Sequence, residues 1–155
     1  MEFEVAVSLR EITWDTLDSI LALKVRPEQE RFVASNAKSL AQALFQPKHA
    51  WFRAIHAGDI PVGFIMTYED REKPEFFLWR IMVDSEHQGR GYAREALELL
   101  VERLRSIPQA RQLTTCHVPG EGGPGGFYQK FGFRYTGDKM GEELAMKLEL
   151  GPPVS

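Results

Sequence analysis

One glycine-spaced segment of the chain carries the residue types that bind anions. Gln88-Gly89-Arg90-Gly91-Tyr92-Ala93 follows an apolar run that stops at Asp84, and a helical pattern of apolar residues comes after it. Glycine tolerates positive φ and has no Cβ, so a ligand can approach the backbone closely. Free amides and the helix dipole at the start of that helix favour a phosphate. Arg90 and Arg94 add positive charge that can make forked bonds to the same group.

Two familiar phosphate-binding loops do not fit this segment. The sequence has no Gly-x-x-x-x-Gly-Lys-Ser/Thr, and it has only two of the three glycines of Gly-x-Gly-x-x-Gly. The repeated β-α-β units of a dinucleotide-binding domain are also missing from the pattern. A bare Gly-x-Gly can be no more than a tight turn between a strand and a helix, so the segment alone leaves both interpretations open.

A second segment, Phe127-Tyr128-Gln129-Lys130-Phe131-Gly132-Phe133, points in the same direction. The first segment resembles the coenzyme A loop of the GNAT N-acetyltransferases, Gln/Arg-x-x-Gly-x-Gly/Ala. The second resembles the Leu/Phe-Tyr-x-Lys-x-Gly-Phe pattern near the end of the same fold. The resemblance extends loosely over residues 3–150, and it is greatest to the bacterial spermine/spermidine (diamine) acetyltransferases.

The resemblance implies an α/β (α+β) fold in one GNAT-type domain over residues 1–150. The expected architecture is a mixed, mostly antiparallel sheet of about seven strands flanked by helices, in the order β-α-α-β-β-β-α-β-α-β-β. Alternating or continuous apolar runs predict strands, and three- and four-residue spacings predict helices. The strands are expected at 3–9, 51–57, 60–68, 76–83, 113–118, 134–136 and 144–150, and the helices at 15–23, 28–33, 36–44, 92–105 and 127–131. Asp15 is expected to cap the first helix, and Asn36 or Ser35 to start the third, with Leu40, Ala43 and Leu44 as its apolar face. The tail 151–155 is expected to be disordered.

Composition restricts the class of protein. A chain of 155 residues with 43% hydrophobic and 26% charged residues is typical of one globular domain. The net charge of −3 argues against a nucleic-acid partner, which usually needs a basic surface. Cys116 is the only cysteine, which excludes an intrachain disulfide, and no metal site is expected. No 18-residue apolar span and no signal-peptide pattern occur, so we expect a cytoplasmic protein without a membrane partner.

The resemblance also implies a donor site for acetyl-CoA. The amides of the glycine loop would hold the pyrophosphate, and the backbone of Ile81, Met82 and Val83 would pair with the pantetheine arm. Tyr128 would donate to the departing thiolate, because a phenol with an ordinary pKa near 10 stays protonated at neutral pH. Lys130, in the same pattern, is expected beside the coenzyme.

The general base is harder to assign. Some polyamine acetyltransferases have an acidic residue where this chain has Trp79. Glu75, Glu28 or Glu30 could replace it directly or through water, although each is more often a solvated surface carboxylate. His117 is expected near the cleft, but a lone histidine is more often a bystander.

The segment 24–36 resembles the acceptor-binding stretch of the spermine/spermidine acetyltransferases. Glu28 and Glu30 could neutralise an ammonium group, and Phe32 or Trp79 could offer an aromatic face to it. We therefore expect acetyl transfer to a primary amine of a small cationic acceptor, a polyamine or diamine, by direct attack in a ternary complex. The alternatives are an aminoglycoside-type antibiotic, an amino acid or a protein N-terminus as acceptor, or a non-catalytic acyl-CoA-binding module. Tyr128 disfavours the non-catalytic module, and a homodimer is left open.

Overall fold

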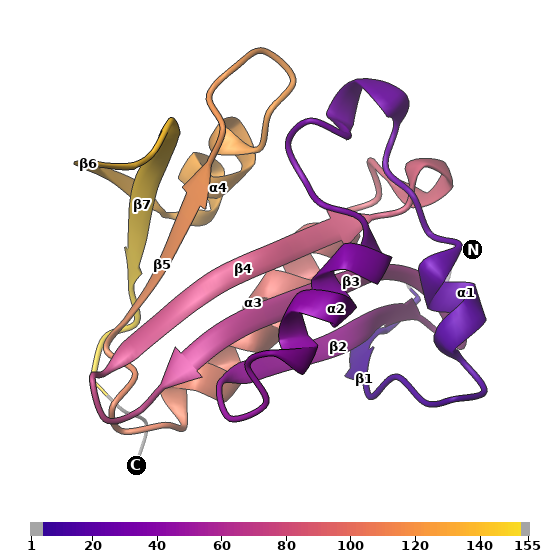
Figure 1. The fold of residues 1–155 in the computed structure, drawn as a ribbon, viewed down its shortest axis with the longest axis horizontal. Helices are drawn as coiled ribbons and strands as arrows, with labels where there is room; N and C mark the ends of the chain where they lie inside the picture. The colour runs from indigo at the N-terminus through magenta and orange to yellow at the C-terminus, as the bar shows by residue number, and fades with distance from the viewer. Residues whose placement is uncertain (1–4, 153–155) are drawn as a thin grey trace.

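A seven-stranded sheet in the order β1-β2-β3-β4-β5-β7-β6 runs through the protein (Figure 1). The structure is a computed structural model and describes residues 5–152. All neighbouring strands are antiparallel except β4 and β5, which are parallel. This confirms the expected mixed, mostly antiparallel sheet. The strands are β1 (Val7–Arg10), β2 (Ala50–Ala57), β3 (Ile60–Asp70), β4 (Glu75–Val83), β5 (Gln112–His117), β6 (Arg134–Met140) and β7 (Glu143–Glu149).

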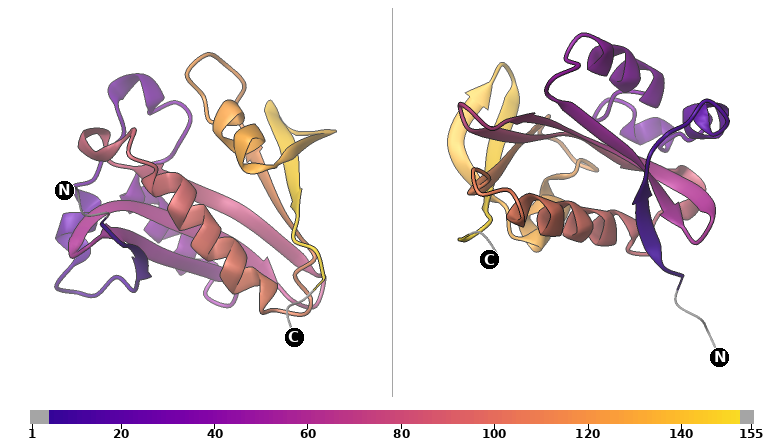
Figure 2. Two further views of the ribbon diagram at one scale, coloured as in Figure 1. Left: turned by 180° about the vertical axis from the view of Figure 1, so that it is seen from behind. Right: turned by 90° about the horizontal axis from the view of Figure 1, so that it is seen from below.

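Helices cover both faces of the sheet in the predicted order along the chain. They are α1 (Leu17–Leu21), α2 (Asn36–Leu44), α3 (Tyr92–Arg105) and α4 (Gly125–Phe131), with short 3-10 turns η1 (Pro27–Gln29) and η2 (Ser85–His87). Helices α1 and α2 lie on one face, and α3 lies on the other (Figures 1 and 2). Ser35 caps α2 as predicted, because its side chain accepts a hydrogen bond from the Lys38 amide at 3.1 Å.

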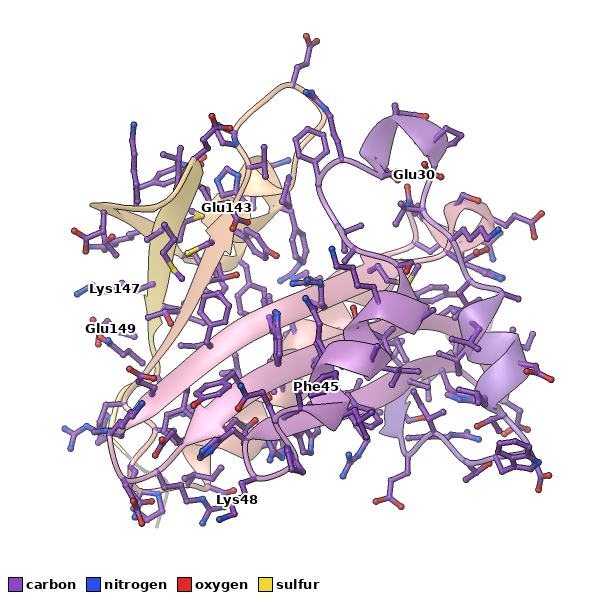
Figure 3. All side chains as sticks on the ribbon, viewed as in Figure 1. Glu30, Phe45, Lys48, Glu143, Lys147 and Glu149 are labelled. Carbon is purple, nitrogen blue, oxygen red and sulfur yellow. The ribbon has the colours of Figure 1, made fainter. Side chains whose placement is uncertain are left out.

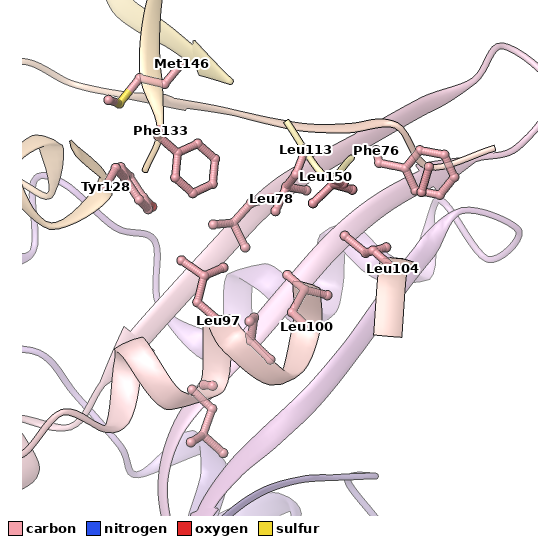
Figure 4. Packing of buried hydrophobic residues seen from close by; sticks show 14 of the residues in the cluster. Phe76, Leu78, Leu97, Leu100, Leu104, Leu113, Tyr128, Phe133, Met146 and Leu150 are labelled. Carbon is pink, nitrogen blue, oxygen red and sulfur yellow. The ribbon is translucent and has the colours of Figure 1, made fainter. Parts of the chain in front are cut away.

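Each face of the sheet has its own apolar core. Residues of α3 that recur at helical spacing pack on β4 and β5, together with Tyr128 and Phe133 from the C-terminal part (Figure 4). On the other face, Ile20 and Ala43 pack on Phe64, Met66 and Met82. Each fully buried side chain of this size stabilises the fold by about 1.5–3 kcal/mol relative to its exposed state. The two cores hold the sheet rigidly on both sides.

Strands β4 and β5 form a parallel ladder of only two residue pairs within the described residues. Phe77 pairs with Thr114 and Leu78 with Thr115, and Thr115 Oγ1 also donates to the Leu78 carbonyl at 2.9 Å. Beyond Leu78 the two strands diverge, as Figure 1 shows. Within residues 5–152, no strand therefore pairs with this edge of the C-terminal half of β4.

Several local predictions need correction. The helix expected at 28–33 is only the single turn η1. Phe32 lies beyond this turn and packs against the segment before α4, where a Cβ on Gly123 would lie 2.9 Å from Phe32 Cε1. Leu44 was expected on the apolar face of α2 but is 73% exposed. The cap of α1 is Thr16 instead of Asp15. The first strand begins at Val7, and its predicted start at residue 3 lies outside the described residues, as do residues 153–155 of the predicted tail.

Candidate active site

A cavity of about 810 Å³ opens where β4 and β5 separate. Its walls come from the C-terminal ends of both strands, the segment after η1, the loop that leads into α3, the start of α4 and the first residue of β7. This volume lies within the usual range of small-molecule sites. Segments that are far apart in the sequence therefore meet around one space.

The glycine loop has the conformation that its sequence predicts. Gly89 and Gly91 have φ angles of 80° and 81°, which an L side chain rarely adopts. The first helical bond of α3 runs from the Glu95 amide to the Gly91 carbonyl at 3.0 Å, so the amides of Tyr92 and Ala93 precede it and lack a helical partner. A Cβ built on either glycine would meet nothing within 4 Å. The turn thus needs glycine for its geometry and also leaves open space in front of free amides.

The Gln88 side chain ties this loop to both neighbouring walls. Its Nε2 donates to the Val83 carbonyl and to Gln29 Oε1, each at 2.9 Å. Asp84 Oδ1 accepts from the Lys24 amide at 2.8 Å, which fixes the end of β4 to the chain between α1 and η1. The loop and the segment after η1 are consequently held in one arrangement.

A β-bulge at Trp79 sets the direction of the side chains on β4. Met66 pairs with Arg80 and Thr67 with Leu78, so Trp79 is an additional residue on β4. Trp79 packs against the core on the α1 and α2 face, and Arg80 reaches the same face, where its Nη2 donates to Gln42 Oε1 at 3.0 Å. Bulges commonly re-aim side chains next to active sites.

The Arg80 guanidinium lines the cavity without a carboxylate within 4 Å among the described residues. Its Nη1 donates to the Trp79 carbonyl at 2.9 Å. Its buried Nε has no hydrogen-bond partner among residues 5–152. Burial lowers the pKa of Arg80, and the charges of Glu143 and Tyr128 act in the opposite direction. Arg80 is thus a partly desolvated cation that faces the cavity.

Tyr128 is buried, with 6% of its surface exposed, and it lines the cavity from α4. Its ring packs against Phe133 at a centroid distance of 5.3 Å. Burial raises the pKa of Tyr128 to about 12, and the Thr115 hydroxyl and the Arg80 charge limit this rise. The phenol therefore remains protonated throughout the neutral range.

His117 lines the cavity but has both ring nitrogens engaged. Nδ1 lies 3.0 Å from the Val118 carbonyl, which can only accept, so Nδ1 carries the proton. Nε2 then accepts from the Tyr135 hydroxyl at 2.9 Å. This arrangement favours the bystander interpretation of His117, since neither nitrogen is free to take a proton from a substrate.

The structure brings most of the predicted site residues together and leaves four of them outside. Those that line the cavity are Ile81, Met82, Val83, Gln88, Gly89, Gly91, Tyr92, Ala93, Arg94, Tyr128, Glu30, Phe32 and Trp79. Arg90, Lys130, Glu28 and Glu75 are exposed and do not line it. Glu75 starts β4, and at about 3.3 Å per residue it lies roughly 20 Å along the strand from Ile81. Glu75 is therefore too far from the cavity to reach a group bound near Ile81.

Glu143, the half-buried first residue of β7, was not among the predicted site residues. This carboxylate lines the cavity from the β5 and β7 side, opposite the wall that holds Glu30 (Figure 3). The predicted strand began at Leu144, one residue later. Only the alternation along β7, which places Glu143 on the face away from Leu144 and the buried Met146, could have indicated its orientation.

A helix start with free amides beside two separating parallel strands defines a protein that binds an extended, phosphate-bearing ligand. Residues 7–133 match the family model described as acetyltransferase (GNAT) family, and the chain belongs to this family. It is thus an N-acetyltransferase that uses acetyl-CoA as donor. Within residues 5–152, no group of three or more His, Cys, Asp or Glu side chains is arranged to hold a metal. No helix in the described part of the chain is long and apolar enough to cross a bilayer.

Curated relatives and solved structures resemble the chain over most of its length. The spermine/spermidine N(1)-acetyltransferase of Bacillus subtilis (strain 168) is 24% identical over 149 residues, which are 92% of this chain and 98% of the relative. The L-2,4-diaminobutyric acid acetyltransferase of Streptomyces avermitilis is 30% identical over 89 residues, 57% of this chain and 50% of that protein. The spermidine N-acetyltransferase of Vibrio cholerae, solved with CoA and spermine, superposes with a TM-score of 0.75 at 14% identity and covers 96% of this chain and 98% of its own.

Proposed function

We propose that the protein transfers the acetyl group of acetyl-CoA to a primary amine of a small cationic acceptor, with polyamines and diamines as the favoured class. The observation that carries this proposal is the single cavity that joins the glycine loop, Tyr128 and the wall formed by Glu30 and Phe32. Donor and acceptor can meet there in a ternary complex, which lowers the entropic cost of the reaction. The names of the B. subtilis and V. cholerae relatives support the polyamine class.

The donor would lie between the glycine loop and β4. Amides at the start of α3 and the open space at Gly89 and Gly91 suit a pyrophosphate. The edge of β4 that faces β5, from Ile81 to Val83, pairs with no strand of the described residues and offers backbone groups to the pantetheine arm. The acyl carbonyl would then lie near the point where β4 and β5 separate.

Tyr128 would donate a hydrogen bond to the coenzyme sulfur as negative charge develops there. With a pKa of about 12, this phenol is a weaker acid than an ordinary thiol with a pKa near 8.5. Full proton transfer to the sulfur would cost about 5 kcal/mol at 1.36 kcal/mol for each pH unit. The role that fits these values is stabilisation of the leaving thiolate by a protonated donor.

The acceptor would enter between the segment after η1 and β7. Glu30 supplies negative charge, and Phe32 and Trp79 supply aromatic surface, which together suit an ammonium group. Arg31 lies 4.4 Å from the Phe32 ring centroid and donates to the Glu121 carbonyl at 3.2 Å, so this wall contacts the segment before α4. The acceptor end of the cavity is thereby narrowed.

An amino acid that carries a second amine is the other acceptor favoured by a specific observation. The Arg80 guanidinium faces the cavity without a carboxylate partner in the described part of the chain, so it could hold the carboxylate of such an acceptor. The name of the S. avermitilis relative agrees with this class.

An acceptor screen tests both classes. Loss of the acetyl-CoA thioester is followed with spermine, spermidine, putrescine, 2,4-diaminobutyrate, an aminoglycoside and a peptide. Turnover with the polyamines alone supports the proposal, and preference for 2,4-diaminobutyrate would favour the amino acid class. Failure of every amine to accelerate thioester loss would overturn the acetyltransferase proposal for small amines.

A further inference from the structure

Glu143 is placed on the cavity side of the sheet by the register of β5 and β7. Ala145 pairs with Cys116 and Leu144 with His117, so Glu143 shares a face with Ala145 and Cys116. Cys116 lines the cavity, whereas Met146 on the opposite face belongs to the core beneath α3. The Glu143 side chain therefore points away from that core and into the cavity.

The Glu143 carboxylate has no ion-pair partner within 4 Å among the described residues. Lys147, a cation of the same strand, pairs with Glu149 instead. Arg80 and Cys116 line the same cavity as Glu143. Burial lowers the pKa of Arg80 and raises that of Cys116, and the charge of Glu143 acts to raise both. The Arg80 guanidinium is already directed at Gln42 and the Trp79 carbonyl. A half-buried carboxylate without a partner is stabilised by any cation that enters the cavity.

The other candidates for the general base are less suited to take a proton from the acceptor amine. Glu75 and Glu28 lie outside the cavity, and the two nitrogens of His117 are occupied. Glu30 is exposed and lies on the opposite wall in Figure 3. Glu143 is the more buried of the two carboxylates that line the cavity, and it comes from β7 on the wall opposite Glu30.

We propose that Glu143 binds the ammonium group that becomes acetylated and accepts its proton. Strand β7 thus supplies, across the cleft, the carboxylate that β4 lacks at Trp79. This inference rests on the proposed acetyl transfer to an amine.

The step balances in atoms and charge. The ammonium gives one proton to Glu143 and becomes a neutral amine. Its nitrogen lone pair attacks the thioester carbon, so a C–N bond forms and the C–S bond breaks with its electrons going to sulfur. The second proton lost by the nitrogen ends on the coenzyme thiolate, and Glu143 releases the first proton to water.

The test compares Glu143→Gln with Glu142→Gln. Glu142 is the preceding residue of the same turn, but it is exposed and does not line the cavity, which makes it a matched control. With spermidine or 2,4-diaminobutyrate as acceptor, Glu143→Gln should lower kcat/KM for the amine by at least about 100-fold. The KM for acetyl-CoA should not change, and Glu142→Gln should stay within about twofold of wild type.

A second measurement requires no turnover. Cys116 is the only thiol of the chain, and Glu143 contributes to the rise of its pKa. Glu143→Gln should therefore lower the pKa of this thiol and speed its alkylation by iodoacetamide, whereas Glu142→Gln should not. Normal amine turnover by Glu143→Gln, or an alkylation profile equal to that of wild type, would refute the role of Glu143. If wild type acetylates no amine while alkylation responds as expected, the proposed function fails and the placement of Glu143 stands.

Discussion

Replacement of Tyr128 by Phe removes a single hydroxyl from the cavity and leaves the ring that packs against Phe133. A hydrogen bond to a charged group is worth about 1.5–3 kcal/mol. If the phenol stabilises the departing thiolate, its loss should reduce kcat by roughly 10- to 150-fold, at 1.36 kcal/mol for each factor of ten. The affinity for acetyl-CoA should change little, because the hydroxyl would act mainly on charge that develops during the reaction.

The assay measures loss of thioester absorbance under saturating acetyl-CoA and amine, with calorimetry for the affinity of acetyl-CoA. Tyr135→Phe is the matched control, since it removes a phenol hydroxyl that bonds to His117 and does not line the cavity. The two variants should each retain a folded state within about 1 kcal/mol of wild type. Unchanged kcat in Tyr128→Phe, or an equal loss in Tyr135→Phe, would refute the assignment of Tyr128 as donor to the sulfur.

Two further predictions concern the glycine loop and the buried phenol. Gly91→Ala should raise the KM for acetyl-CoA at least about tenfold, because its Cβ would enter the open space in front of the α3 amides. Gly137→Ala, at a φ of 91° and outside the cavity, has the same backbone strain and should leave that KM unchanged; equal effects would show that strain alone is responsible. Because the folded pKa of Tyr128 lies near 12 and the ordinary value is 10.0, its contribution to stability is complete below pH 10 and is lost as pH rises toward about 12. In urea unfolding over that interval, wild type should lose about 2.7 kcal/mol more than Tyr128→Phe, and parallel curves would contradict the buried, protonated phenol.

Local patterns in the sequence predicted the parts of the site that neighbouring residues control. Gly89 and Gly91 could be assigned to a positive-φ turn because few other residues adopt that conformation. Ser35 could be assigned as a helix cap because its hydroxyl reaches an amide only three residues away. Apolar patterns likewise predicted the individual strands and helices, and the family resemblance implied their order. The helix expected at 28–33 is only the turn η1, and the ends of other elements shifted.

The acceptor side could not be predicted in the same way, because it depends on register and on contacts between distant segments. Glu75 and Trp79 belong to the same strand, yet the strand carries Glu75 far from the cavity while the bulge directs Trp79 toward α2. Phe32 was expected in a helix, but it lies beyond the single turn η1 and packs against Gly123, which is far from it in the sequence.

The positive-φ turn at Gly89 and Gly91 and the start of α3 could be read from the sequence, since turn geometry and helix starts are encoded by residues close together in the chain. Which carboxylates line the cavity depends on the tertiary structure. Glu143 lies 107 residues after Asn36 in the sequence, and no local pattern marks it as a site residue. It reaches the cavity because β7 pairs with β5 in a register that turns it away from the core. The divergence of β4 and β5 after Leu78 then opens the space in which these carboxylates and the glycine loop face one another.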